Sequence, residues 1–161
     1  MKPYFTILII ILLFVGLSGC NSTSDTRNAD GEAVEYNLGE SVIVGSIKYT
    51  FLSVYWEESW DTYSYKLEIK GENIGNVKET SQISVKEYEM ENGYRYSPAI
   101  GYGTAHFSIN PGKNETETIS CPEDSQLISG IDRDFLPVAK IYLEIGEIYQ
   151  PSERTTIVLN V

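Results

Sequence analysis

The chain of 161 residues has few of the residues that enzymes commonly use for catalysis and metal binding. It contains one histidine, His106, and two cysteines, Cys20 and Cys121. The patterns His-Glu-x-x-His and Cys-x-x-Cys, which mark common zinc sites, are absent, and so is the Gly-x-Ser-x-Gly pattern of serine hydrolases. The sequence therefore predicts a protein that is not an enzyme and that needs no cofactor.

Basic residues are also scarce. The chain has 12 lysines and arginines against 23 aspartates and glutamates, which gives a net charge of −11. Binding to nucleic acid needs a basic patch that neutralises phosphates, and adsorption to anionic lipid head groups needs the same sign of charge. The composition therefore argues against both kinds of partner and favours solubility.

No apolar run in the chain is as long as the roughly 20 residues that a membrane-spanning helix needs. Residues 4–15 form a shorter apolar run that follows Lys2 and fits the core of a secretory signal. Residues 17–20, Leu-Ser-Gly-Cys, resemble the lipobox of prokaryotic lipoproteins. The resemblance implies a signal peptide over residues 1–19 and a lipid on Cys20. An uncleaved membrane anchor with an incidental cysteine is the alternative.

A lipid on Cys20 would decide where the protein is located. Each buried methylene contributes roughly 0.8 kcal/mol to membrane binding, and a single acyl chain binds only marginally. A lipoprotein cysteine carries two or three chains, so the attachment would be stable. We therefore expect an exported protein that is lipid-anchored to the outer face of the cell membrane.

The second cysteine would then have no disulfide partner in this chain. Stability must come from an apolar core, which a single domain of this length can supply. We expect Cys121 to be a small buried residue, with a reactive surface thiol as the alternative.

The rest of the chain divides into a tether and one domain. Residues 21–33 contain no large apolar side chain, so burial cannot offset the entropy of ordering them. We predict a flexible linker over residues 20–35 and a domain over residues 36–161. Within the domain, apolar and polar residues alternate in several short runs, which is typical of antiparallel strands with one buried face.

The alternating runs predict an all-β, immunoglobulin-like antiparallel sandwich of about seven to nine strands. With no helix to cover a sheet, two sheets must cover each other. Residues 92–93, Asn-Gly, predict a type I′ hairpin turn between two of the strands. A change of phase after Phe51 suggests either a bulge or a strand that changes neighbours. The predicted strands are residues 41–44, 47–55, 63–72, 82–91, 94–97, 105–109, 115–121, 138–145 and 154–161.

Several motifs, in order, resemble a widespread immunoglobulin-like domain of unknown function. Residues 38–54 resemble its opening strands, residues 65–76 its strand and Asn-x-Gly element, residues 92–96 its Asn-Gly hairpin, and residues 109–112 its Pro-Gly loop. The chain departs from that family in a longer insert between Pro122 and Leu136. The resemblance implies a secreted or lipid-anchored sandwich, and the family carries no catalytic residues to transfer.

The densest local feature is the segment from Trp56 to Tyr65, which holds both tryptophans of the chain. Aromatic faces suit a sugar or a protein partner, and loops at sandwich ends often carry binding residues. We therefore predict a partner-binding loop, with packing of the aromatics over the sandwich end as the alternative. Its residues are Trp56, Glu57, Glu58, Trp60 and Asp61.

The sequence also contains weaker candidates for a metal site or a catalytic site. Asp132 and Asp134 could begin a calcium loop, but the remaining ligands of an EF-hand are missing. Glu115 and Glu117 lie on one face of a strand and would need a cleft to act as a glycosidase pair. Residues 101–106 resemble half of a phosphate loop and are better explained as an ordinary loop. No metal site is therefore expected.

These observations together predict a non-enzymatic cell-surface lipoprotein with a binding or scaffolding domain. Its partners would be the membrane, through the lipid, and an envelope protein or glycan. The alternative is a structural accessory subunit of an envelope assembly, and an envelope hydrolase is disfavoured.

Overall fold

The computed structural model describes residues 33–59, 62–98, 102–122, 138–148 and 154–161. These residues form ten strands and no helix, so none of them lies in a helix long and apolar enough to cross a membrane. The strands are β1 (Val34–Asn37), β2 (Ser41–Val44), β3 (Ile47–Ser59), β4 (Thr62–Asn73), β5 (Glu79–Met90), β6 (Arg95–Tyr96), β7 (Thr104–Ile109), β8 (Asn114–Pro122), β9 (Val138–Gly146) and β10 (Thr155–Asn160).

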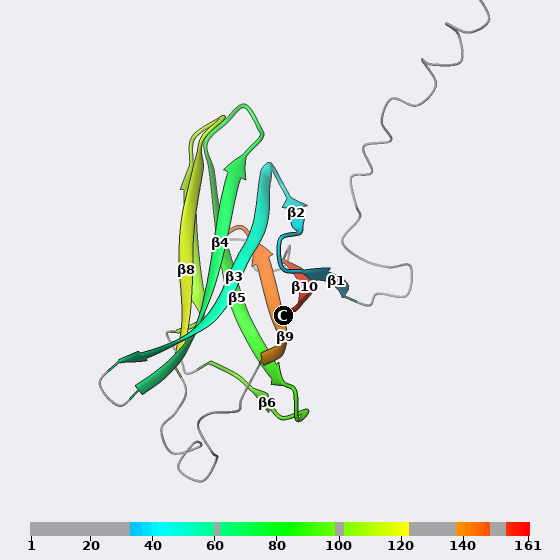
Figure 1. The fold of residues 1–161 in the computed structure, drawn as a ribbon. Helices are drawn as coiled ribbons and strands as arrows, with labels where there is room; N and C mark the ends of the chain where they lie inside the picture. Colours follow the sequence, from blue (N-terminus) through cyan, green and yellow to red (C-terminus); the bar gives the residue numbers. More distant parts are fainter. Residues whose placement is uncertain (1–32, 60–61, 99–101, 123–137, 149–153) are drawn as a thin grey trace, which may run out of the picture.

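The strands form two sheets that pack against each other (Figure 1). The six-stranded sheet has the order β1-β10-β9-β5-β6, and β7 pairs with another part of β5. The four-stranded sheet has the order β2-β3-β4-β8. The neighbouring strands are antiparallel, apart from β1 and β10, which are parallel. The predicted all-β sandwich is confirmed.

The central strands follow the order of immunoglobulin-like sandwiches. β3, β4 and β8 correspond to strands A, B and E of such a fold, and β7, β5, β9 and β10 correspond to C′, C, F and G. β1 and β2 extend the two sheets at their edges. β1 was not among the predicted strands, and it begins at Val34, before the predicted start of the domain at residue 36.

The change of phase predicted in β3 is confirmed as a β-bulge. The register of β3 against β4 shifts between Phe51 and Ser53, so Leu52 is an extra residue in β3. Before the bulge the odd-numbered side chains point into the sandwich. Beyond it Val54 and Trp56 take the inward positions, because the side-chain period of a strand is two.

The β5–β6 hairpin forms as predicted, but its turn is different. The amide of Met90 donates to the carbonyl of Tyr94 at 2.9 Å, so the connection has three residues, 91–93. Gly93 holds the last loop position with a φ of 84°, which suits glycine. The predicted two-residue type I′ turn at Asn92 and Gly93 is therefore wrong, and the loop is the three-residue kind that ends in a left-handed glycine.

The space between the sheets is filled by apolar side chains from every long strand. Tyr49 and Phe107 meet across it edge to face, with ring centroids 5.4 Å apart. Gly71 of β4 lets the Phe107 ring approach, because a Cβ at that position would lie 2.8 Å from the ring. The largest fully buried side chains are Tyr49, Phe51, Phe107, Ile47, Leu67, Ile69, Ile83, Met90, Ile119, Leu143, Ile145 and Ile157.

Two polar contacts fix the end of the sandwich where β4 finishes. The buried amide of Asn73 donates to the carbonyls of Ile109 (2.8 Å) and Val77 (2.7 Å), which ties two loops together. The Tyr49 hydroxyl hydrogen-bonds with the Ser81 hydroxyl from the facing sheet. Both contacts satisfy groups that would otherwise be costly to bury.

Candidate functional site: the β3–β4 hairpin

The β3–β4 hairpin is the longest paired unit of the fold and carries the predicted tryptophan. Its strands contain 13 and 12 residues. On the other side of β3, β2 pairs only with Ile47 to Thr50. The far part of the hairpin therefore continues past the body of the sandwich, as Figure 1 shows.

Trp56 lies in this far part, directly opposite Tyr65 on the neighbouring strand. The two ring centroids are 3.6 Å apart, with a 43° angle between the ring planes. Tyr65 is buried, whereas Trp56 keeps 38% of its surface exposed. The indole is thus held against a fixed ring while part of it stays accessible to a partner.

Trp56 is the exposed end of a row of aromatic rings, which we call the aromatic row: Trp56, Tyr65, Tyr88 and Tyr96. Tyr65 meets Tyr88 of the facing sheet at 5.7 Å, and Tyr88 stacks on Tyr96 of β6 at 5.5 Å. Such ring pairs contribute beyond their buried area. The row therefore connects the hairpin rigidly to the six-stranded sheet.

Polar residues on the opposite, outer face of the hairpin hold its strands in place. The Lys66 ammonium lies 2.9 Å from the Glu57 carboxylate and donates to the Ser120 hydroxyl at 2.7 Å. Tyr55 lies on this face and is 46% exposed. The hairpin thus presents Trp56 on one face and Tyr55 with Glu57 on the other.

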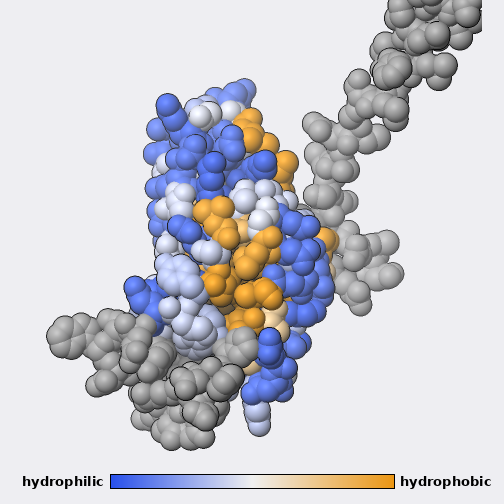
Figure 2. Space-filling model, in the orientation of Figure 1, coloured by the Kyte–Doolittle hydropathy of each residue, from blue (hydrophilic) through white to orange (hydrophobic). Residues whose placement is uncertain are grey.

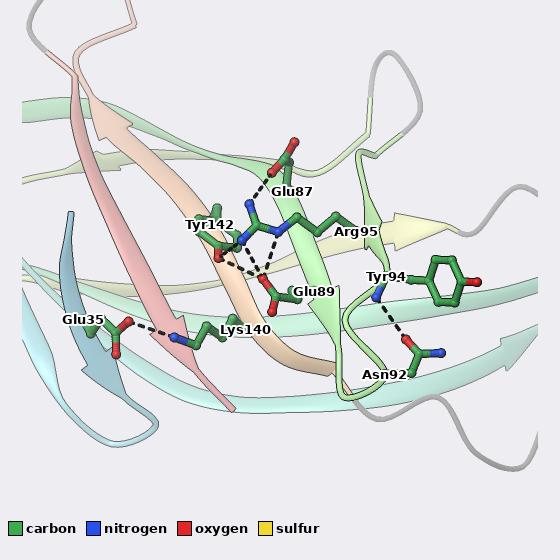
Figure 3. A network of polar contacts seen from close by, with 8 residues as sticks. All are labelled: Glu35, Glu87, Glu89, Asn92, Tyr94, Arg95, Lys140 and Tyr142. Atoms are coloured by element: carbon green, nitrogen blue, oxygen red, sulfur yellow. Dashed lines mark hydrogen bonds and ion pairs between the residues drawn. The ribbon is translucent and has the colours of Figure 1, made fainter. Parts of the chain in front are cut away.

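A second polar cluster lies on the outer face of the six-stranded sheet (Figure 3). Arg95 of β6 makes a two-point contact with Glu89, at 2.8 and 2.9 Å, and its guanidinium lies 4.7 Å from the ring centroid of Tyr142. Arg95 also donates to the Tyr142 hydroxyl, which donates to Glu89 at 3.0 Å. Burial, followed by the Glu89 carboxylate, raises the pKa of Tyr142, so its hydroxyl stays a donor.

The cluster continues across the sheet to β1. Lys140 lies 2.8 Å from Glu35 (Figure 3). Asn160 donates to the same carboxylate at 3.2 Å. The hydrogen bonds from Lys140 and then Asn160 lower the pKa of Glu35. These charges pair with one another, so the cluster is best explained as a clasp that fastens β6 and β1 to the sheet.

A cavity of about 150 Å³ lies at the other end of the sandwich. Its walls include Glu79, Glu147 and the hydrogen-bonded hydroxyls of Tyr49 and Ser81. Two carboxylates and two paired hydroxyls are an ordinary hydrated lining for an open sandwich end. Within the described ranges, no group of three or more His, Cys, Asp or Glu side chains could hold a metal ion.

The residues that suggested other chemistry occupy ordinary structural positions. His106 is an exposed residue of β7 and falls in the predicted strand at residues 105–109, so the interpretation of residues 101–106 as a loop is wrong for residues 104–106. Glu115 accepts a hydrogen bond from the Ser108 amide at 3.3 Å, so it caps β7 from the neighbouring strand. Cys121 is buried as predicted, and burial raises the pKa of its thiol to about 12.

The predicted binding loop begins inside a strand. Trp56 and Glu57 belong to β3, and the backbone of Glu58 does too, because β3 and β4 stay paired up to Ser59 and Thr62. The prediction that a loop begins at Trp56 is wrong. The other predicted site residues lie outside the described residues: Cys20, Trp60, Asp61, Asp132 and Asp134.

Sequence reasoning missed the aromatic row behind Trp56. Tyr65 is visible in the sequence as an inward position of an alternating run. Its contact with Tyr88 depends on how the two sheets face each other, which no local pattern reveals. The signal that was available is the number of tyrosines, 12, which is high for a chain of this length.

Comparisons with known proteins identify no family. No family model and no curated protein match the chain. Among solved structures, an uncharacterized beta-sandwich protein from Clostridium difficile 630 is similar, with 14% identity and a TM-score of 0.44. The match covers 81% of this chain and 95% of that one. It carries no conclusion about function.

Proposed function

We propose that this protein is a non-enzymatic, lipid-anchored domain that binds or scaffolds an envelope protein or glycan at the outer face of the cell membrane. Residues 1–19 serve as the export signal and Cys20 carries the lipid. The support for this part is the short apolar run that ends in Leu-Ser-Gly-Cys. The sandwich supplies the binding domain.

The position of Trp56 is the observation that carries the binding role. Its indole is part-exposed in the part of the β3–β4 hairpin that lies beyond β2, and it is backed by the buried ring of Tyr65. Tryptophan is enriched among residues that dominate binding energy. A ring that is already held in place loses little conformational freedom when a partner binds, which favours affinity.

The test is chemical cross-linking on intact cells, followed by mass spectrometry of the captured partners. The full-length chain is compared with Trp56→Ala and with Tyr102→Ala, which removes an exposed aromatic residue that lies outside the aromatic row. We expect Trp56→Ala to weaken capture by ~2 kcal/mol, as for a binding hot spot. Tyr102→Ala should leave capture unchanged.

The thermal midpoint of each variant is measured alongside, because loss of folding would also reduce capture. A partner captured equally by all three proteins would contradict a site at the hairpin. Capture that depends on residues spread over a broad apolar face would favour the accessory-subunit role instead.

A further inference from the structure

The two edges of the sandwich are treated differently. At one flank, groups from β8 cap β7 and the residue before it: the Ser108 amide donates to Glu115, and the Gly103 amide donates to the carbonyl of Ser120 at 3.0 Å. Such capping prevents a foreign strand from joining the sheet. At the other flank, β3 is a long strand that is covered only in part.

The backbone pairing along the outer edge of β3, the edge away from β4, ends at the bulge. β2 pairs with β3 up to Thr50, and the chain before β2 completes the edge at Phe51 through Gly39 (2.7 Å) and Glu40 (3.2 Å). From Leu52 to Ser59, β4 lies along one side of β3. Across the described ranges no strand pairs with its other side.

The side chains along this part of β3 suit a second strand. Leu52 is 41% exposed, Val54 is half-buried against the core, and Tyr55 is exposed on the outer face. Figure 2 shows apolar atoms at the surface in this region, between hydrophilic areas. A strand laid along the edge would bury its inward side chains near Val54 and leave the others beside Tyr55 and Glu57.

We propose that the outer edge of β3, from Leu52 onward, binds an extended segment of a partner protein by adding it as a strand to the four-stranded sheet. This inference rests on the proposed binding function and names its mode. Main-chain hydrogen bonds supply affinity in such complexes, and alternate side chains supply specificity.

The negative charge of this chain indicates which kind of partner segment would bind at the edge of β3. The chain is strongly acidic, with a net charge of −11, and Glu57, Glu58 and Asp61 follow one another closely in the sequence. One lysine, Lys66, pairs with Glu57. The segment therefore alternates apolar and basic residues. The same acidity opposes edge-to-edge pairing of two copies of this chain, because like charges would face each other.

The experiment uses the full chain in detergent micelles and three capped synthetic peptides of seven residues. The first alternates lysine and valine. The second has the same sequence with alternate backbone nitrogens methylated, and the third replaces lysine by glutamate. Binding is followed by titration, and hydrogen exchange is measured at the amides of residues 52–57.

We expect the first peptide to bind and to slow exchange at alternate amides of this segment at least tenfold. The methylated peptide should bind at least tenfold more weakly, because it lacks main-chain donors, and so should the acidic peptide. Four results would overturn the inference: slow exchange at these amides before any peptide is added, protection that rises with protein concentration alone, equal binding of the methylated peptide, or equal binding of the acidic peptide.

The result also separates this inference from the proposed function. Capture of an envelope partner that depends on Trp56 but gives no protection at residues 52–57 would leave the binding role standing and overturn strand addition.

Discussion

The outer face of the six-stranded sheet and the projecting β3–β4 hairpin both carry exposed aromatic and charged side chains, yet they are organised differently. On the sheet, the Arg95 guanidinium packs over the Tyr142 ring and forms an ion pair with Glu89, so these three side chains contact one another. On the hairpin, Trp56 packs on Tyr65 and keeps 38% of its surface exposed. The first arrangement fastens strands together, and the second leaves surface for a partner.

The difference teaches that exposure alone does not identify a binding residue. Tyr142 and Trp56 are both aromatic residues that neighbour carboxylates. The hydroxyl of Tyr142 accepts a hydrogen bond from Arg95 and donates one to Glu89, and both partners belong to its own sheet. Trp56 instead packs on Tyr65 of the adjacent strand, in a hairpin that extends past the body of the sandwich.

The largest contrast is between a ring in the core and the ring on the hairpin. Phe107→Ala should lower the free energy of unfolding by about 3–5 kcal/mol, because it leaves a cavity beside Tyr49. Trp56→Ala should cost less, about 2 kcal/mol, because 38% of its surface is already exposed. Chemical denaturation of both variants measures the difference. Equal losses would make Trp56 a core residue and end its role as a binding residue.

A smaller effect is expected from adding a single methyl group inside the sandwich. In Gly71→Ala, the new Cβ would lie 2.8 Å from the Phe107 ring and 2.9 Å from the end of Ile109. Overpacking of this kind typically costs about 1–3 kcal/mol. Gly112→Ala is not a suitable control, since its φ of 66° introduces backbone strain. Thr116→Ala on the exposed outer face is suitable and should be nearly neutral. Equal thermal midpoints for Gly71→Ala and Thr116→Ala would contradict the packing described for Gly71.

Alkaline pH should weaken the core and leave the hairpin surface unaffected. Burial raises the pKa of Tyr49 from 10.0 and that of Cys121 from 9.0, each to about 12. Above pH 9 the unfolded chain loses these protons while the folded protein keeps them, so stability is full below pH 9 and falls as pH rises toward 12. Each group adds a slope of roughly 1.4 kcal/mol per pH unit.

Denaturation at several pH values between 9 and 12 tests this dependence. Cys121→Ala should remove the part of the slope that begins near pH 9 and leave the part due to Tyr49. An unchanged slope in Cys121→Ala would mean that the thiol ionises as readily in the folded protein as in the unfolded chain.

The smallest effect is expected at the clasp. Arg95→Ala removes the contacts with Glu89 and Tyr142, which are exposed to solvent and therefore weak. We expect faster hydrogen exchange at the Met90 amide, which closes the β5–β6 hairpin, and an unchanged midpoint of global unfolding. A large fall in that midpoint would show that the outer face contributes to the core stability.

The sequence was sufficient for the sandwich because its strands alternate with a period of two. The runs at residues 138–145 and 154–161 became β9 and β10 with ends shifted by about one residue. β1 could not be predicted in the same way. It has four residues, and its partner is the last strand of the chain, so its pairing is a property of the whole fold.

The candidate site was only partly predictable. Trp56 drew attention to the segment that forms the far part of the β3–β4 hairpin, and the change of phase after Phe51 correctly indicated a bulge. The segment was interpreted as a loop because acidic and polar residues interrupt the alternation after Trp56. Pairing with β4 keeps those residues in a strand, and the support from Tyr88 comes from the other sheet.

The most direct test of the account is a comparison of Trp56→Ala with Tyr102→Ala in the same two measurements, partner capture on intact cells and thermal unfolding. Both variants remove an exposed aromatic side chain. We expect Trp56→Ala to lose capture at a temperature where the domain is still fully folded, with a smaller fall in the unfolding midpoint than Phe107→Ala causes, and Tyr102→Ala to retain both. Unchanged capture by Trp56→Ala, or a loss that merely follows a fall in its midpoint, would contradict the account.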